Sequence, residues 1–394
     1  MTDTIGAHAQ VGAVNWLSGL RVLEVTTGVA APLIGRILGE LGADVIKLES
    51  RAKLDVNRTR VPRPDDPEGF PASEAFQLLH EANAGKRSIT LNLKEAAGKE
   101  LFLELLRDVD VFIENFAPGW LERLGLSPDA ILAAAPQLIM LSASGYGQTG
   151  PLRTQRAYAP VMTSLAGIEG LVGYGPDDVT GASSLALADL NCSFYGVFLI
   201  TAALRGRQVT GRGQYLDLSQ TEAAACLIGE AFVEQQLGLR VPAPQGNTST
   251  DGEHWTLLAA AGDDRWVAAG TDRDDRTVSQ LPELTGQPGR PGRPSAADLL
   301  RVLADHGFEA APVLTPDEVA TDELFQRQAL LQRVTHPLEA IGELTITSVP
   351  WHLDGIVPRI AGPAPCLGSD TDDFFRRRLS AEAFTTYAED KVFF

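Results

Sequence analysis

The chain has 394 residues, of which 44% are hydrophobic and 21% are charged, a composition typical of a globular protein rather than a disordered one. Its length exceeds what one hydrophobic core usually organises, so we expect two domains or one domain with an insertion. The formal net charge of -18 argues against nucleic acid or an acidic membrane as a partner, because both need a basic surface.

Cysteine and histidine spacing indicates neither a disulfide framework nor a metal site. Cys192, Cys226 and Cys366 lie far apart without a CxxC motif, and the six histidines show no ligand spacing. The N-terminus lacks the basic and apolar regions of a signal peptide, and no apolar run reaches the roughly 20 residues of a membrane span. We therefore expect a cytoplasmic protein without a bound metal or a membrane partner.

Strand-like and helix-like segments alternate from residue 20 onward. RVLEV at 21–25 and DVIKLE at 44–49 read as strands, with a small-residue loop at 26–32 and an amphipathic helix at 33–43 between them. The polar, proline-containing stretch at 51–71 is predicted to be a long loop. Further elements are expected as strands at 88–93, 109–115, 138–144 and 215–219, and as helices at 95–108 and 194–206. The alternation predicts an α/β fold with a mostly parallel sheet and helices on both faces.

The pattern of strand-like and helix-like segments changes near residue 225. A strand pair at 255–261 and 265–270 is followed by GQPGRPGRP at 286–294, which resembles a linker. We predict a large domain over 1–224, a small α+β domain over 225–325, and a segment over 326–394 that returns to the large domain.

The loop TTGVAAP and the helix after it form a candidate anion-binding corner. A dinucleotide site would need GxGxxG, whereas Gly28 and Gly35 are too few and wrongly spaced, so dinucleotide binding is a minor alternative.

Three later motifs combine polar residues with strand ends. Lys86 and Arg87 precede a strand and fit a phosphate site or a solvated loop. Asn115 and Phe116 follow a strand, where ligands bind in open α/β sheets, although a helix cap and a core residue explain them equally well. The glycine-rich SASGYGQTGP contains Gly145 and Tyr146 and fits either a turn or a close backbone approach to a ligand.

Asp189 is the most informative single residue. It is a lone carboxylate in the small, apolar stretch ALADLNCSFYG, where an unpaired buried charge is costly. It fits a helix N-cap, and it equally fits a nucleophile at a helix N-terminus whose small neighbours, including those at 182–184, leave room for a substrate.

Six segments in this order resemble the family III CoA-transferases: GLRVLEVTTGVAAPLIGRILGELGADVIKLE, NAGKRSITLNLK, DVFIENFAPGWLERLGL, LIMLSASGYGQTGP, ALADLNCSFYG and RGRQVTGRGQYLDLS. The resemblance covers about residues 17–260 well and PAPCLG more weakly. It implies a Rossmann-like large domain, a smaller inserted domain, and two chains interlocked as a homodimer. Asp189 alone matches the family's nucleophile. The implied CoA contacts are Gly28, Val29, Lys86, Arg87, Asn115, Phe116 and Arg123.

The resemblance implies transfer of CoA from an acyl-CoA to a carboxylic acid through an aspartyl anhydride and an aspartyl-CoA thioester, with CoA as a substrate and no permanently bound cofactor. The small polar loop at 243–254 is a candidate lid. Two departures keep alternatives open. Ala159 replaces an acid that is common in relatives, and the second domain is abbreviated, which leaves a non-catalytic CoA-binding protein possible. An α-methylacyl-CoA racemase would need a histidine where Tyr158 stands, and a tyrosine is a poor base near neutral pH.

Overall fold

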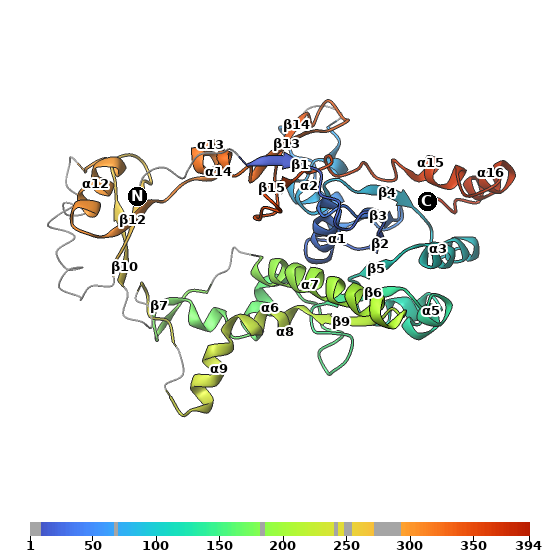
Figure 1. Ribbon diagram of the computed structural model, residues 1–394, viewed down its shortest axis with the longest axis horizontal. Helices are drawn as coiled ribbons and strands as arrows, with labels where there is room; N and C mark the ends of the chain where they lie inside the picture. Colours follow the sequence, from blue (N-terminus) through green and yellow to red (C-terminus); the bar gives the residue numbers. More distant parts are fainter. Residues whose placement is uncertain (1–8, 67–69, 182–185, 240–242, 248–253, 272–292) are drawn as a thin grey trace. The chain divides into compact units, whose positions relative to one another are not determined.

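The computed structural model describes residues 9–66, 70–181, 186–239, 243–247, 254–271 and 293–394 (Figure 1). Their contacts form two compact units: Met1–Ala166, Ser184–Ile228 and Glu323–Phe394 make the first, and Gly167–Ser183 and Gly229–Asp322 make the second. The small residues at 182–184, most of the predicted linker at 286–294 and half of the candidate lid at 243–254 lie outside the described residues. The predicted domain boundaries stay a prediction.

The first unit is built on a six-stranded sheet in which every neighbouring pair is parallel. This confirms the predicted α/β class. The strands β5 and β6 are buried throughout, as expected of apolar runs in a parallel sheet covered on both faces. In sheet order the strands are β4 (Arg87–Thr90), β3 (Asp44–Glu49), β2 (Arg21–Val25), β5 (Val111–Glu114), β6 (Ile139–Ser144) and β9 (Tyr215–Ser219).

One face of the sheet packs against the helices α1 (Ala30–Glu40) and α7 (Leu187–Thr210). Ile34 and Leu38 of α1 share a core with Ile200 of α7 and with strand residues such as Ile113. Gly196 allows the two helices to approach, because a Cβ there would lie 2.3 Å from Cδ1 of Ile34. This packing places the first turn of α7 near the beginning of α1.

The opposite face packs against α3 (Ala96–Asp108), α5 (Pro128–Ala134) and the C-terminal helices α15 (Thr371–Arg376) and α16 (Ala381–Glu389). Phe112 of β5 meets Phe102 of α3 edge to face, with ring centroids 5.5 Å apart. Phe375 joins the same core from α15. The C-terminal segment therefore completes the core that the first 144 residues begin.

The second unit has a three-stranded antiparallel sheet with α12 (Ala296–Asp305) packed on it. The predicted strand pair at 255–261 and 265–270 is confirmed as β10 and β11.

The remaining strands and 3-10 helices are β1 (Gln10–Gly12), β7 (Gly173–Gly175), β8 (Asp178–Val179), β10 (His254–Ala259), β11 (Trp266–Thr271), β12 (Glu309–Pro312), β13 (Leu331–Thr335), β14 (Glu343–Thr347), β15 (Ile356–Pro358), η1 (Val56–Arg58), η2 (Ala72–Glu74), η3 (Glu169–Leu171) and η4 (Cys226–Ile228). The remaining α-helices are α2 (Gln77–Asn83), α4 (Trp120–Arg123), α6 (Ala159–Leu165), α8 (Gln220–Ala225), α9 (Gly229–Gln236), α12 (Ala296–Asp305), α13 (Pro316–Thr321) and α14 (Glu323–Arg327).

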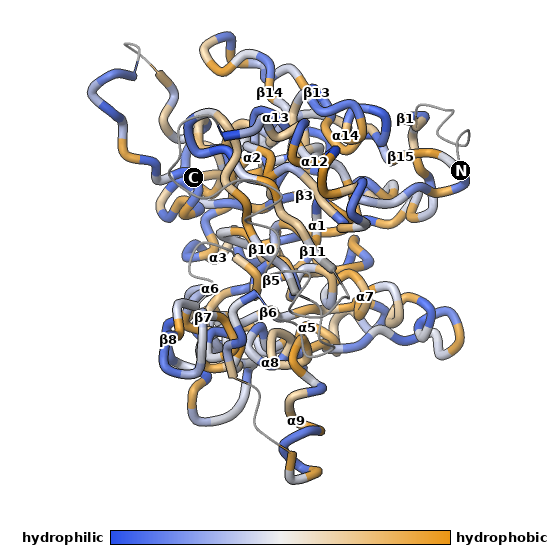
Figure 2. Tube along the Cα trace, turned by 90° about the vertical axis from the view of Figure 1, so that its left-hand side faces the viewer, coloured by the Kyte–Doolittle hydropathy of each residue, from blue (hydrophilic) through white to orange (hydrophobic). Residues whose placement is uncertain are grey.

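Among the described residues, α7 is the single helix long and apolar enough to cross a membrane by length and composition, although the sequence predicted no such run. Figure 2 shows hydrophobic residues along it. One third of its most apolar window is buried, and its buried residues pack on α1 and the sheet.

Candidate active site

Asp189 lies in the first turn of α7, and its side chain lines a cavity of about 540 Å³. The helix-cap interpretation is wrong, because Ala186 and not Asp189 occupies the cap position. Ser193, one turn later, donates its hydroxyl to the carbonyl oxygens of both Asp189 and Ala30 at 2.8 Å. The Ser193 hydroxyl thus links the beginning of α7 to the first turn of α1.

The Asp189 carboxylate receives no hydrogen bond from any residue that the structure describes. Burial raises its pKa from the ordinary 3.8 to about 6. The helix N-terminus favours the charged form, but burial has the larger effect here. At neutral pH the group remains an anion with free lone pairs, which is the state that a nucleophile needs.

The walls of this Asp189 cavity come from several segments that the sequence singled out. Gly28 and Val29 precede α1, Asn115 and Phe116 follow β5, and Gly145 follows β6. Asn115 holds the first two segments together, because its Oδ1 accepts from the Thr27 amide at 2.9 Å and its Nδ2 donates to the Thr27 carbonyl at 2.8 Å. The carboxyl ends of adjacent parallel strands thus form one pocket.

Four other predicted residues do not line the Asp189 cavity. Lys86 is buried, and its Nζ donates to Glu24 Oε1 at 2.7 Å, to the Pro32 carbonyl and to Asn83; burial lowers its pKa to about 8, with Glu24 opposing. Arg87 pairs with Asp44, Arg123 reaches the carbonyl of Pro118 at 3.5 Å, and Tyr146 lines a separate cavity beside Asp217. Their contacts with CoA stay predictions.

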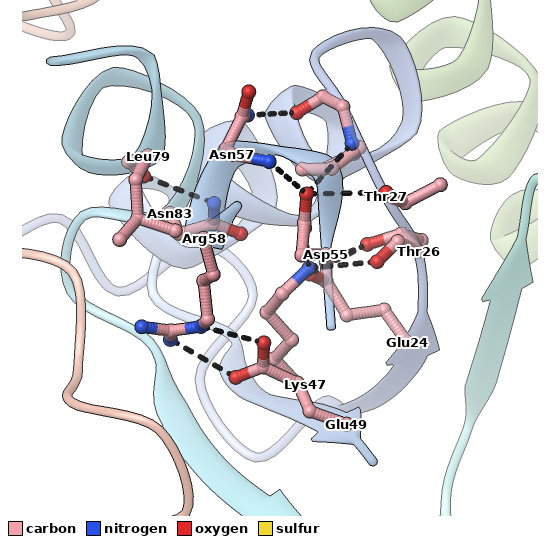
Figure 3. Close-up of polar contacts among 12 residues, drawn as sticks. Glu24, Thr26, Thr27, Lys47, Glu49, Asp55, Asn57, Arg58, Leu79 and Asn83 are labelled. Atoms are coloured by element: carbon pink, nitrogen blue, oxygen red, sulfur yellow. Dashed lines mark hydrogen bonds and ion pairs between the residues drawn. The ribbon is translucent and has the colours of Figure 1, made fainter. Parts of the chain in front are cut away.

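Sequence reasoning missed the buried charges that hold the Thr27–Gly28 loop, which Figure 3 shows. Asp55 Oδ2 pairs with Lys47 Nζ at 3.0 Å, and its Oδ1 accepts from the Gly28 amide and from Thr27 Oγ1, each at 3.1 Å. Asn57 donates to the Gly28 carbonyl at 2.7 Å. Burial by itself would raise the pKa of Asp55, but the Lys47 charge and these amide donors hold it below its usual range. The signal available was an acid and an amide in LDVNR, inside the long polar loop.

Gly35 has a packing role in the same cluster rather than a role at a phosphate. A Cβ at this position would lie 1.9 Å from Oε2 of Glu24. Glu24 in turn accepts from Lys86 and lies 3.8 Å from Lys47, so the glycine makes room for the buried charges under α1.

A second cavity, of about 590 Å³, adjoins the first and shares walls at Thr27, Asn115 and Phe116. Phe116 and Trp120 stack with ring centroids 4.6 Å apart, and Lys53 Nζ lies 5.4 Å from the Phe116 ring centre. Lys94 also lines this Phe116–Trp120 cavity. Apolar rings beside cations suit a ligand that combines a planar group with phosphates.

The model of "CoA-transferase family III" matches residues 17–295 and 290–371. The chain belongs to this family. The assignment confirms the resemblance read from the six motifs, and its match includes the C-terminal segment, where the resemblance was weaker. Membership supports an enzyme that transfers CoA and uses CoA thioesters as substrates.

Relatives across nearly the whole chain carry CoA-transferase names. The succinyl-CoA–L-malate CoA-transferase alpha subunit of Chloroflexus aurantiacus is 30% identical over 93% of this chain and 90% of that protein. The formyl-CoA:oxalate CoA-transferase of Streptomyces avermitilis is 29% identical over 91% of this chain and 94% of that protein. The crystal structure of a CAIB/BAIF family protein from Brucella suis is similar with a TM-score of 0.77 and 27% identity, covering 92% of this chain and 98% of that one. These family III relatives fit the observed parallel sheet.

Proposed function

We propose that this family III protein transfers CoA from an acyl-CoA thioester to a carboxylic acid, with Asp189 as the nucleophile. The observation that carries the proposal is the Asp189 carboxylate, which lies in a cavity without a hydrogen-bond donor from any described residue. A half-buried structural acid would normally be paired, because an unpaired charge that is partly removed from water is costly. A nucleophile must instead be left free to attack.

The reaction proceeds in four steps. A carboxylate oxygen of Asp189 attacks the thioester carbonyl carbon, the carbon–sulfur bond breaks, and CoA leaves as a thiolate while Asp189 and the donor acid remain joined as a mixed anhydride. The thiolate attacks the aspartyl carbonyl and releases the donor acid, leaving an aspartyl-CoA thioester. The acceptor carboxylate attacks this thioester to form a second anhydride and a thiolate. That thiolate attacks the acceptor's acyl carbon, which restores Asp189. Each intermediate retains the acyl activation of the thioester.

Each tetrahedral step needs hydrogen-bond donors for the oxyanion. The beginning of α1 lines the Asp189 cavity at Val29 and Ala30, and no side chain caps this helix. Its first amide groups are therefore our candidates. The Gly28 amide is not among them, because it already donates to Asp55.

We place the nucleotide end of CoA in the Phe116–Trp120 cavity and its thiol end in the Asp189 cavity. Lys53, Lys94 and Arg156 line the first cavity, and within the described residues none of them pairs with a carboxylate. A protein with a net charge of -18 needs such local cations to bind polyphosphate. Asn115, at the wall shared by both cavities, positions the passage between them.

We also propose a cytoplasmic homodimer. Phe198 and Val209 of α7 and Leu165 of α6 are 66%, 76% and 56% exposed, and a second copy would cover such apolar side chains. The three free cysteines fit a reducing compartment. Because one relative is named an alpha subunit, light scattering on the purified chain must show whether it dimerises alone.

The test is transfer itself. The purified protein is incubated with succinyl-CoA and acetate, and new acetyl-CoA is measured by liquid chromatography and mass spectrometry, followed by a panel of other donors and acceptors. We expect transfer by the wild type and by the control Asp129→Asn, which changes an exposed acid on α5, and none by Asp189→Asn. Equal transfer by Asp189→Asn would contradict the proposal.

A further inference from the structure

Two polar side chains in the wall of the Asp189 cavity are buried, and each has an atom without a partner in the part of the chain that the structure describes. Ser144 is 6% exposed and Gln220 is 7% exposed, and both line this cavity. Among the described residues, neither the Ser144 hydroxyl nor the Gln220 side-chain oxygen Oε1 has a hydrogen-bond partner. Each such atom costs about 1–3 kcal/mol when left unsatisfied, and native proteins leave few of them.

The backbone brings these two side chains together. Ser144 ends β6 and is in register with Ser219, the last residue of the neighbouring parallel strand β9. Gln220 is the next residue and begins α8. Thr221 then fixes the junction, because its amide and its hydroxyl both donate to the Gly145 carbonyl, at 3.0 Å and 2.7 Å. Ser144 and Gln220 therefore lie at neighbouring strand ends, on the same cavity as Asp189.

The wall of the cavity, as far as the structure describes it, makes no hydrogen bond to either atom, although polar residues such as Arg156 and Tyr158 also line it. Ala30, Ala159 and Met162 line the same cavity and offer no side-chain hydrogen-bond donor. Ser142, two residues earlier on β6, is different, because it hydrogen bonds to the Glu114 carboxyl. The unpartnered pair is therefore local to the pocket and not a general feature of this strand.

We propose that Ser144 and Gln220 are specificity-determining residues that bind a hydroxyl group on the acyl chain transferred at Asp189. This inference rests on the proposed function. A substrate hydroxyl can donate its proton to Gln220 Oε1 and accept the proton of Ser144, so it satisfies both atoms at once. A methylene in the same place would satisfy neither, and a carboxylate could only accept. The enzyme therefore acts on hydroxyacyl-CoA donors in preference to unsubstituted ones of equal chain length.

The test compares donors that differ by a single oxygen. Initial rates with acetate as acceptor give kcat/KM for butanoyl-CoA, 2-hydroxybutanoyl-CoA and 3-hydroxybutanoyl-CoA. We expect at least one hydroxy donor to exceed butanoyl-CoA about tenfold or more, the effect of one or two hydrogen bonds. Gln220→Leu, which preserves the approximate size of the side chain, and Ser144→Ala should each reduce that ratio several-fold. The ratio compares two donors on one enzyme preparation, so a partly unfolded variant does not distort it.

A binding measurement separates this inference from the proposed function. Asp189→Asn should bind the same thioesters without reacting, so calorimetry compares their dissociation constants with and without Gln220→Leu. A loss of discrimination on adding Gln220→Leu supports the inference even if turnover is slow. Equal binding and equal turnover of hydroxy and unsubstituted donors would overturn it, while Asp189-dependent transfer from butanoyl-CoA would leave the proposed function intact. Strong discrimination that both variants retain would also overturn it.

Discussion

Replacing Asp189 with asparagine should remove activity and also stabilise the protein. Burial raises the pKa of this carboxyl from 3.8 to about 6, so the fold disfavours its ionised form. Each pKa unit corresponds to about 1.4 kcal/mol, so the gain in unfolding free energy from removing the charge is at most about 3 kcal/mol. Because the carboxylate keeps some contact with water in its cavity, we expect about 2 kcal/mol. Asparagine has nearly the same shape and no charge to bury.

The direction in which stability changes with pH follows from proton binding at Asp189. Between about pH 4 and 6 the folded state holds more protons at this site than the unfolded state, so the stability from protonated Asp189 is present at low pH and lost as pH rises through 6. Urea unfolding of the wild type and Asp189→Asn should thus differ by about 2 kcal/mol more at about pH 8 than at about pH 4. The exposed control Asp129→Asn should show no such gain. A variant no more stable than the wild type at pH 8 would refute the reasoning.

Three further predictions follow from the site. The pH profile of kcat/KM should fall on the acid side near pH 6, where Asp189 becomes protonated; an acid limb near 4 would contradict this. Asp55→Asn should cost about 3–5 kcal/mol in urea unfolding, because Lys47 loses its closest carboxylate, and a loss below 1 kcal/mol would show that the pair is not required. Lys53→Met should raise KM for acyl-CoA several-fold with little change in kcat. An unchanged KM would show that the nucleotide end of CoA does not bind beside Phe116.

Much of the fold and the central acid of the site could be read from the sequence. The βαβ pattern of residues 21–49 predicted parallel strands, and the sheet follows because hydrophobic periodicity is a local signal. Asp189 stood out because a lone charge in a small, apolar stretch is costly wherever it folds. Asn115 and Gly145 could be placed at the cavity because strand ends in a parallel sheet share one edge.

The remaining features depend on tertiary contacts that have no local signature. Lys86 reads as a solvated cation, and only the fold shows Glu24 and Asn83 beneath it. Asp55 lies in a long loop without periodicity, so its bond to the Gly28 amide could not be anticipated. Gln220 follows a strand and begins a helix, where a polar residue is ordinary; its burial without a partner is visible only in the cavity.

The central claim is that Asp189 becomes covalently bonded to CoA. The most direct measurement is the intact mass of the protein after incubation with succinyl-CoA, acetyl-CoA or 3-hydroxybutanoyl-CoA, followed by peptide mapping. We predict an added mass of CoA less one water on the peptide that contains Asp189, absent in Asp189→Asn and removed by adding an acceptor acid. An adduct that persists in Asp189→Asn, or transfer that depends on Asp189 without any adduct under rapid quenching, would contradict the account.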